Sequence, residues 1–252
     1  MPSYTAASAV ADFQRNHALV TARIEAACER AGRDPAGVRL LPVSKTVDEA
    51  RMRAAVAAGM TGFGENKVQE AKRKSAALAD VPGLSWSLIG HLQTNKARDA
   101  VSFASEFQAL DSLRLAEALD RRLDAAGRRL DVFVQVNTSD EESKYGLPPD
   151  QLTGFLDELP RFPCLRVRGL MTLAVFSPDP DAVRRCFVRL RRLRDQVRDG
   201  APDGVGLDEL SMGMSGDYEI AVEEGATVVR VGQAIFGSRP TPDALYWPRD
   251  GV

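Results

Sequence analysis

One lysine at the end of an apolar segment has the clearest chemical potential in this sequence. The segment Val38-Arg-Leu-Leu-Pro-Val43 has the composition of a buried strand and runs directly into Ser44, Lys45 and Thr46. In proteins of alternating strands and helices, ligands bind at the carboxyl ends of the strands. A lysine there can form a Schiff base with a carbonyl ligand if its surroundings leave the amine neutral. A solvated lysine at a strand end is the alternative, and this segment alone does not exclude it.

Two downstream loops of small residues have the composition of a phosphate site. They read Ser211-Met-Gly-Met-Ser-Gly216 and Arg230-Val-Gly-Gln233. Glycines let the main chain come close to an anion, and Ser211 and Ser215 supply hydroxyl donors. Each loop can also be a plain turn, with Ser215 capping the helix that follows.

Strand-like and helical segments alternate along the whole chain of 252 residues. We expect a leading helix from about residue 7 to 30, and then eight strands whose middles or ends are marked by Lys45, Phe63, Trp86, Phe107, Phe133, Val167, Leu210 and Val229. The seventh strand is expected to be short, at Glu209-Leu210. Eight alternations predict an α/β protein formed by a single (β/α)₈ barrel domain over residues 1–252, with an extra N-terminal helix. The rival is an open doubly wound sheet, which normally has a glycine-rich dinucleotide loop that this sequence lacks.

Closure of such a barrel brings the first and eighth strands together. Lys45 and Arg230 should therefore approach each other although they are far apart in the sequence. The loops after the seventh and eighth strands are where barrels most often bind phosphate. The two small-residue loops fall at these positions, so the sequence predicts a site for an aldehyde that carries a phosphate. Pyridoxal 5'-phosphate (PLP) fits this description.

Six motifs closely resemble those of the pyridoxal phosphate homeostasis proteins, in the same order, from about residue 10 to 240. They are Pro42-Val-Ser-Lys-Thr46, Phe63-Gly-Glu-Asn66, Ile89-Gly-His-Leu-Gln-Thr-Asn-Lys96, Gly169-Leu-Met-Thr172, Ser211-Met-Gly-Met-Ser215 and Arg230-Val-Gly-Gln-Ala-Ile-Phe-Gly237. The resemblance implies a fold like the barrel domain of alanine racemase, a PLP fold of type III, with Lys45 carrying the cofactor. It also implies phosphate contacts from Ser211, Ser215, Gly232 and residue 233, and Arg230 facing the pyridine nitrogen.

The cofactor-binding residues that we assign combine these two lines of reasoning. They are Lys45, Asn66, Ser211, Met212, Ser215, Arg230, Gly232 and Gln233. No catalytic or metal-binding residue is assigned. The sequence departs from the family pattern at Gln233, where Thr or Ser is usual, and at Ser87, where a histidine is common. The first departure puts the side-chain phosphate contact of residue 233 in doubt, but not its backbone contact.

Several polar residues near the expected site have two readings. Glu65 and Asn66 can contact the ligand or cap a helix. His91 can be catalytic or pack as a ring in its loop. Lys144 can form a competing Schiff base or bind an anion of a partner, although a solvated loop lysine is the preferred interpretation. The arginines between residues 184 and 194 resemble a nucleic-acid stripe, but we interpret them as an exposed helix face.

The arginine at position 230 affects which function we expect. A guanidinium beside the pyridine nitrogen disfavours protonation of the ring, and an unprotonated ring is a poor sink for carbanion charge. In alanine racemases a tyrosine from another domain of the partner subunit supplies a second acid–base group, and the chain here ends soon after the expected barrel. We therefore expect a PLP carrier that protects the cofactor and delivers it to apo-enzymes. The alternatives are a PLP-dependent, racemase-like enzyme and a sugar-phosphate barrel in which Lys45 pairs with phosphate.

Composition narrows the choice of partners and compartment. The net charge of −2 gives no general attraction to nucleic acid or anionic membranes. Three scattered cysteines argue against a disulfide framework, and two histidines without suitable neighbours argue against zinc. No leader peptide or apolar segment of membrane-spanning length is evident. We expect a cytoplasmic protein and, without a racemase-like dimer site, a monomer.

Overall fold

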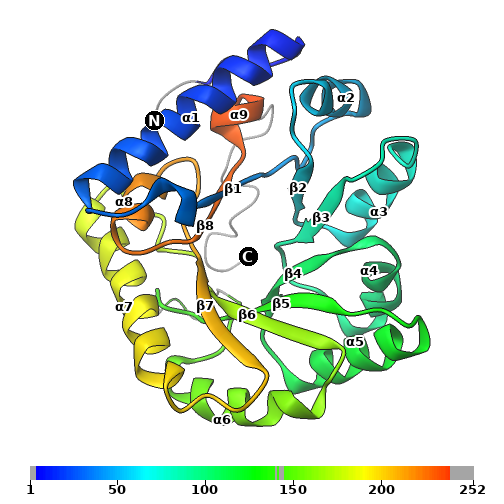
Figure 1. The fold of residues 1–252 in the computed structure, drawn as a ribbon, viewed down its shortest axis with the longest axis vertical. Helices are drawn as coiled ribbons and strands as arrows, with labels where there is room; N and C mark the ends of the chain where they lie inside the picture. Colours follow the sequence, from blue (N-terminus) through cyan, green and yellow to red (C-terminus); the bar gives the residue numbers. More distant parts are fainter. Residues whose placement is uncertain (1–3, 140, 142–144, 239–252) are drawn as a thin grey trace, which may run out of the picture.

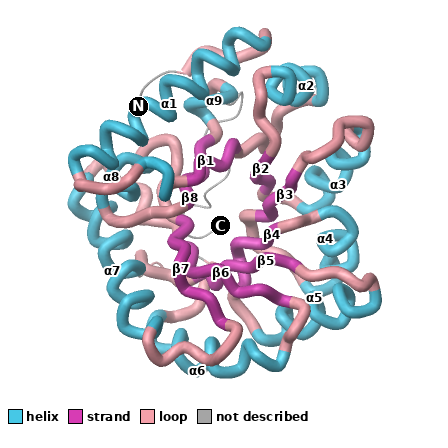
Figure 2. Tube along the Cα trace, viewed as in Figure 1, coloured by secondary structure: helices cyan, strands magenta, loops and turns pink. Residues whose placement is uncertain are grey.

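The computed structural model describes residues 4–139, 141 and 145–238. Its centre is a ring of parallel strands surrounded by helices (Figures 1 and 2). The strands are β1 (Arg39–Pro42), β2 (Gly62–Glu65), β3 (Ser85–Leu88), β4 (Glu106–Leu110), β5 (Leu130–Gln135), β6 (Leu165–Met171), β7 (Val205–Ser211) and β8 (Val228–Val231). The surrounding helices are α1 (Val10–Arg30), α2 (Glu49–Ala57), α3 (Val68–Ala77), α4 (Ala97–Phe103), α5 (Leu113–Ala125), α6 (Leu152–Glu158), α7 (Pro180–Arg198), α8 (Tyr218–Glu223) and α9 (Gln233–Phe236).

The sheet closes into the predicted barrel. The eight strands pair in the order β1-β8-β7-β6-β5-β4-β3-β2, so that the first strand lies beside the last. The remaining junction, between β1 and β2, is made by a parallel bridge from Val43 to Gly64 and by a hydrogen bond of 3.0 Å from the Ser44 N–H to the Gly64 carbonyl. The (β/α)₈ fold expected from the sequence is confirmed.

One strand differs from its prediction. β7 begins at Val205 rather than at Glu209, and its first residue pairs with Val167 of β6. Gly206 and Asp208 gave this segment the composition of a turn. Pairing with β6 decides its conformation, because strand formation depends on neighbours more than on intrinsic preference.

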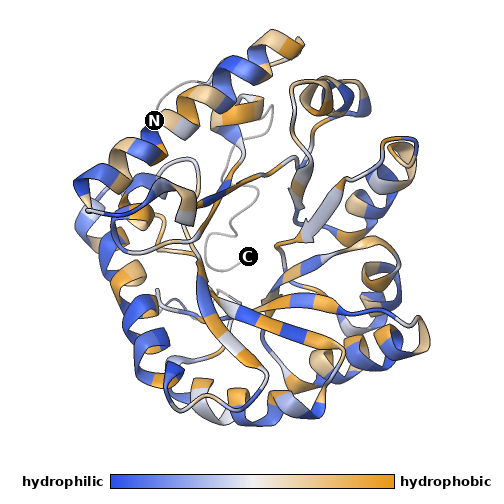
Figure 3. Cartoon of the chain, in the orientation of Figure 1, coloured by the Kyte–Doolittle hydropathy of each residue, from blue (hydrophilic) through white to orange (hydrophobic). Residues whose placement is uncertain are grey.

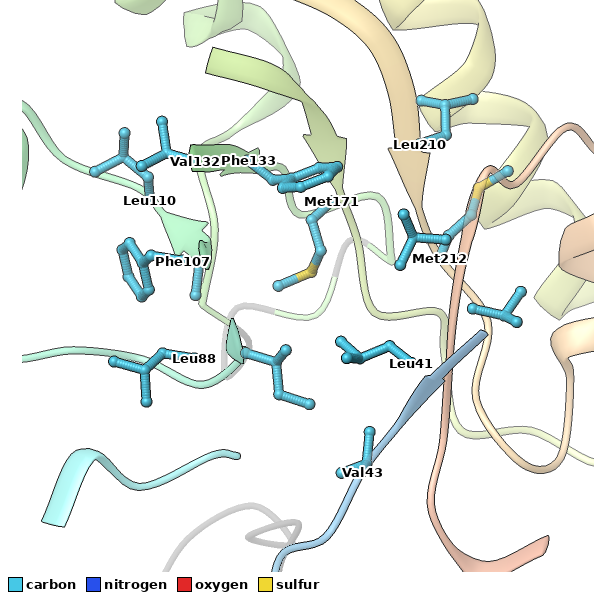
Figure 4. Close-up of a cluster of buried hydrophobic side chains, with 14 of the residues drawn as sticks. Leu41, Val43, Leu88, Phe107, Leu110, Val132, Phe133, Met171, Leu210 and Met212 are labelled. Atoms are coloured by element: carbon cyan, nitrogen blue, oxygen red, sulfur yellow. The ribbon is translucent and has the colours of Figure 1, made fainter. Parts of the chain in front are cut away.

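Apolar residues make up most of the buried core, and a smaller set of buried polar side chains lies among them on the strands. Figure 4 shows Leu41, Phe107 and Met171, which come from three different strands, in one cluster of buried side chains. In α7 the buried residues recur at helical spacing, Val183, Cys186, Phe187 and Leu190, while arginines and other polar residues make up most of the remaining positions (Figure 3). This packing makes a rigid support for the loops at the strand ends.

The predicted extra helix, α1, packs against α9, the helix that follows the last barrel strand. The rings of Phe13 and Phe236 meet edge to face, with centroids 5.5 Å apart, and Asn16 Nδ2 donates to the Ile235 carbonyl at 2.9 Å. α1 therefore holds α9 in place. Within the described residues, none of the helices combines the length and the apolar character needed to cross a membrane.

Candidate functional site

Lys45 follows β1 at the carboxyl end of the barrel, where the sequence predicts it. The adjacency of the first and last strands is confirmed, because Leu41 of β1 pairs with Arg230 of β8. Lys45 is half-buried, and it lines a small pocket together with Gly232 and Gln233 from the loop after β8. The structure thus brings the predicted lysine and part of the predicted phosphate loop into one hollow.

The main chain around Lys45 is held by side chains from β2 and α3. Ser44 Oγ donates to Glu65 Oε1 at 2.7 Å, and the Thr46 N–H donates to Glu70 Oε1 at 2.8 Å. Thr46 has a φ of 67°, a left-handed conformation that no other non-glycine residue adopts in the described part of the chain. A β-branched residue adopts this conformation only when its surroundings hold it there.

Arg230 lies inside the barrel with 2% of its surface exposed. Its Nη1 donates to Ser211 Oγ at 2.6 Å and its Nη2 to the Thr172 carbonyl at 2.8 Å. Burial lowers the pKa of Arg230 to about 10, while the charges of Asp217 and Glu106 act in the opposite direction. The guanidinium therefore remains charged at neutral pH and is fixed in orientation.

A chain of hydrogen bonds connects Arg230 to a carboxylate at the other end of the barrel. Ser211 Oγ donates to Gln108 Oε1 at 2.6 Å, and Gln108 Nε2 donates to Glu106 Oε1 at 2.6 Å. Ser87, at the position where the family often has histidine, also donates to Glu106, at 2.8 Å. The hydroxyl of Ser211 is thus engaged with Arg230 and Gln108, and its phosphate contact stays a prediction.

The loops after β7 and β8 meet at Ser215. The backbone N–H groups of Gly232 and Ala234 both point at Ser215 Oγ, with distances of 3.2 and 3.4 Å. Two amides that converge on one oxygen form the arrangement that binds a phosphate oxygen. Gly213, with a φ of 93°, is needed for this loop, because a Cβ there would lie 2.6 Å from the Ala221 Cβ. These residues fit an anion.

Three other assigned residues differ in their exposure. Asn66 is half-buried after β2, and the loop after β3 packs on it so closely that a Cβ on Gly90 would lie 2.5 Å from the Asn66 carbonyl oxygen. Met212 is fully buried in the apolar cluster, and its N–H donates to the Val228 carbonyl at 3.0 Å (Figure 4). Gln233 is half-buried at the start of α9. Direct contacts from these residues to a cofactor stay predictions.

The structure places His91 and the arginines of α7, for which the sequence allows two interpretations. His91 stacks on Tyr145 with ring centroids 4.0 Å apart, and its Nδ1 lies 3.6 Å from Asp111 Oδ2, which is the ring-packing interpretation. Burial raises the pKa of Asp111, and His91 opposes that effect. In the arginine run of α7, Arg184 forms ion pairs with Glu223 and Glu224. Lys144 lies outside the described residues.

Two polar residues of this region, Lys74 and Gln108, were not expected from the sequence. Both are buried; Lys74 donates to the carbonyl of Ser44, next to the predicted lysine, and Gln108 accepts from the hydroxyl of the assigned residue Ser211. Gln108 interrupts the apolar strand β4, which is a signal that was available in the sequence. Lys74 lies four positions after Glu70 on α3, the spacing of an ion pair on a helix.

Comparison with known families agrees with this geometry. Residues 17–240 match the family model described as the N-terminal domain of alanine racemase. The solved alanine racemase of Streptomyces coelicolor has the same fold, with a TM-score of 0.69 at 21% identity, and the match covers 96% of this chain and 62% of that one. The protein thus falls in the class of barrels that form the first domain of these enzymes.

More similar proteins are close to this chain in length. The pyridoxal phosphate homeostasis protein of Pseudomonas aeruginosa is 45% identical over 224 residues, which cover 89% of this chain and 94% of that protein. The protein of the same name from Escherichia coli K12 is 40% identical over 233 residues, with coverages of 90% and 97%. The structure of PipY of Synechococcus elongatus with PLP bound has a TM-score of 0.76 at 39% identity, covering 85% of this chain and all of PipY (100%). The chain belongs to the pyridoxal phosphate homeostasis protein family.

Proposed function

We propose that this protein binds PLP and acts in its intracellular homeostasis, holding the cofactor as a Schiff base on Lys45. The observation that carries the proposal is the pocket in which Lys45 faces Gly232 and Gln233, beside amides that converge on Ser215. Lys45 matches the aldehyde of the cofactor, and the converging amides match its phosphate. The relatives named for this role and the PLP-bound PipY support the assignment.

The residues around Arg230 favour a carrier over a catalyst. Bound PLP supplies a ring that can withdraw electrons when its nitrogen is protonated. In our proposal Arg230 faces that nitrogen, and its fixed, buried guanidinium opposes protonation there. The protein would then store and protect PLP and release it to apo-enzymes that require it, without robust turnover of its own. We further propose that it does so as a cytoplasmic monomer.

Spectroscopy of the purified protein tests the proposal directly. Protein incubated with PLP should show an absorbance band that is red-shifted from free PLP, and borohydride should fix one cofactor to Lys45. Lys45→Ala should lose the band and the fixation at that position. Lys67→Ala, which changes an exposed lysine at the start of α3, is the matched control and should keep both. A wild-type preparation that takes up no cofactor would refute the proposal.

A racemase-like enzyme is the second candidate, because the barrel is the one that alanine racemases use. It predicts exchange of the α-hydrogen of amino acids for deuterium at enzyme-like rates. The carrier proposal predicts exchange no faster than with free PLP. Nuclear magnetic resonance of an amino acid in deuterium oxide distinguishes the two.

A further inference from the structure

Lys74 of α3 is a buried lysine that the proposed function leaves without a role. Its side chain is 1% exposed, and its Nζ donates to the Ser44 carbonyl, to Glu65 Oε1 and to Glu70 Oε1, each at 2.7 Å. These bonds use the three donors of an ammonium group. Lys74 is therefore fixed in place, and its nitrogen is not available to react with an aldehyde.

The partners of Lys74 lie on both sides of Lys45. Ser44, the residue before Lys45, is held through its carbonyl by Lys74 and through its hydroxyl by Glu65. Thr46, the residue after it, is held in its left-handed conformation by the bond from its N–H to Glu70. We call this set of residues, Lys74 and Glu70 of α3 and Glu65 of β2, the clamp. Lys74 bonds to both carboxylates, so it links Glu65, which holds Ser44, to Glu70, which holds Thr46.

The bonds to Ser44 and Thr46 fix the backbone position from which the Lys45 side chain extends. A lysine side chain has four rotatable carbon–carbon bonds, so its nitrogen explores a region whose position is set by where the backbone places the Cα–Cβ bond. The clamp fixes the backbone on either side while leaving the lysine itself at the pocket. It also holds the unfavourable φ of Thr46, without which the chain after β1 would leave in another direction.

We propose that Lys74 is a positioning residue for Lys45, acting through Ser44 and Thr46. The inference rests on the proposed function, because it concerns attachment of the cofactor. In that step the lone pair of the neutral Lys45 amine attacks the aldehyde carbon. The nitrogen becomes doubly bonded to this carbon, and the carbonyl oxygen leaves as water with the two amine protons. The clamp places the nitrogen for this attack but does not touch the cofactor.

The experiment compares attachment with binding in the full chain after removal of cofactor. Attachment is followed as the absorbance change with PLP and as borohydride fixation to Lys45. Binding without attachment is measured with pyridoxine 5'-phosphate, which has the ring and phosphate but no aldehyde. For Lys74→Met we expect the attachment rate constant to fall by about tenfold or more, because small displacements of a reacting group have large effects on rate. Affinity for pyridoxine 5'-phosphate should stay within about twofold.

Two further variants make the result decisive. Lys72→Met, on the same helix, removes a lysine that is 52% exposed and paired with Asp99, and it should attach PLP at the wild-type rate. Glu70→Ala removes the acceptor of the Thr46 N–H at a partly exposed position, so it tests the same inference if Lys74→Met does not fold. It should slow attachment in the same way.

The outcomes separate the inference from the proposed function. If wild-type protein binds PLP but does not attach it to Lys45, the proposed function fails. If wild type attaches PLP and the clamp variants do so at the same rate, the inference is overturned. Equal losses of attachment and of pyridoxine 5'-phosphate affinity would also overturn it, since they would show general damage to the pocket.

Discussion

Glu65 and Glu70 share the ammonium group of Lys74, yet their surroundings shift their pKa values in opposite directions. Burial raises the pKa of Glu65, and the bonds from Lys74 and Ser44 only partly offset that effect. Its Oε2 has no hydrogen-bond partner within the described residues. Burial also acts to raise the pKa of Glu70, but the bonds from Lys74 and the Thr46 N–H outweigh it and leave the value below the ordinary 4.5.

These opposite shifts predict opposite trends of stability with pH. A carboxyl group with a raised pKa in the folded state stabilises the fold at low pH, and this contribution is lost as the pH rises through that pKa. A lowered pKa gives a contribution that is present above the unfolded-state value and is lost as the pH falls. As the pH rises above about 4.5, Glu65→Gln should therefore gain stability relative to wild type. As the pH rises toward about 4.5, Glu70→Gln should lose stability relative to wild type, because the lowered pKa of Glu70 puts its transition below that value.

Urea unfolding of the cofactor-free protein at several pH values measures both trends. Each variant is compared with wild type at the same pH, so that contributions from the other titrating groups largely cancel. Two trends of the same sign would contradict the assignment of the shifts. Asp80→Asn serves as a control for an exposed carboxylate that an arginine pairs with at the surface, where the effect should be small.

The pairing of β6 with β7 depends on glycine, and the closest approach is at Gly169. Gly169 of β6 lies opposite Glu209 of β7, and a Cβ on it would be 1.8 Å from the Glu209 carbonyl oxygen. No rotation of a side chain relieves a contact with main-chain atoms. The two strands can therefore pair as they do only with glycine at this position.

Replacement of this glycine should be costly, in contrast to another glycine of the same barrel. Gly169→Ala should destabilise the protein by about 3 kcal/mol, because the strands must separate. Gly154 lies inside α6 with nothing near its Cβ position, so Gly154→Ala should instead stabilise by about 0.5 kcal/mol through the lower entropy of the unfolded chain. Urea unfolding checks both. Equal effects of the two changes would show that the close approach is not maintained in solution.

Elements and site were not equally predictable from the sequence. Strands such as β5 are apolar and β-branched, so local preference and burial agree, whereas the start of β7 carries Gly206 and Asp208 and becomes a strand only through its pairing with β6. The meeting of Lys45 with the loop after β8 follows from barrel closure, which strand order alone predicts. Lys74 and Gln108 could not be placed in this way, because their hydrogen bonds depend on which buried side chains face each other in three dimensions.

Across the molecule, α1 and the segment just before it contact the helix at the proposed phosphate site. The Ala7 N–H donates to the Phe236 carbonyl at 3.3 Å, Asn16 bonds to the Ile235 carbonyl, and the Phe13 ring packs on Phe236. These contacts hold α9, whose N-cap residue Gly232 and second residue Ala234 supply the amides that converge on Ser215. The extra helix is therefore expected to support phosphate binding from outside the barrel.

Phe13→Ala tests this connection. Loss of a fully buried phenylalanine should destabilise the fold by about 3–5 kcal/mol and leave α9 less well held. We expect the affinity for pyridoxine 5'-phosphate to fall as well, measured under conditions where the variant is still folded, because the Gly232 and Ala234 amides would no longer be fixed. Leu19 lies on the same helix and is 59% exposed, so Leu19→Ala should change neither the stability nor the affinity. Destabilisation by Phe13→Ala with unchanged affinity would mean that α1 stabilises the barrel without organising its phosphate site.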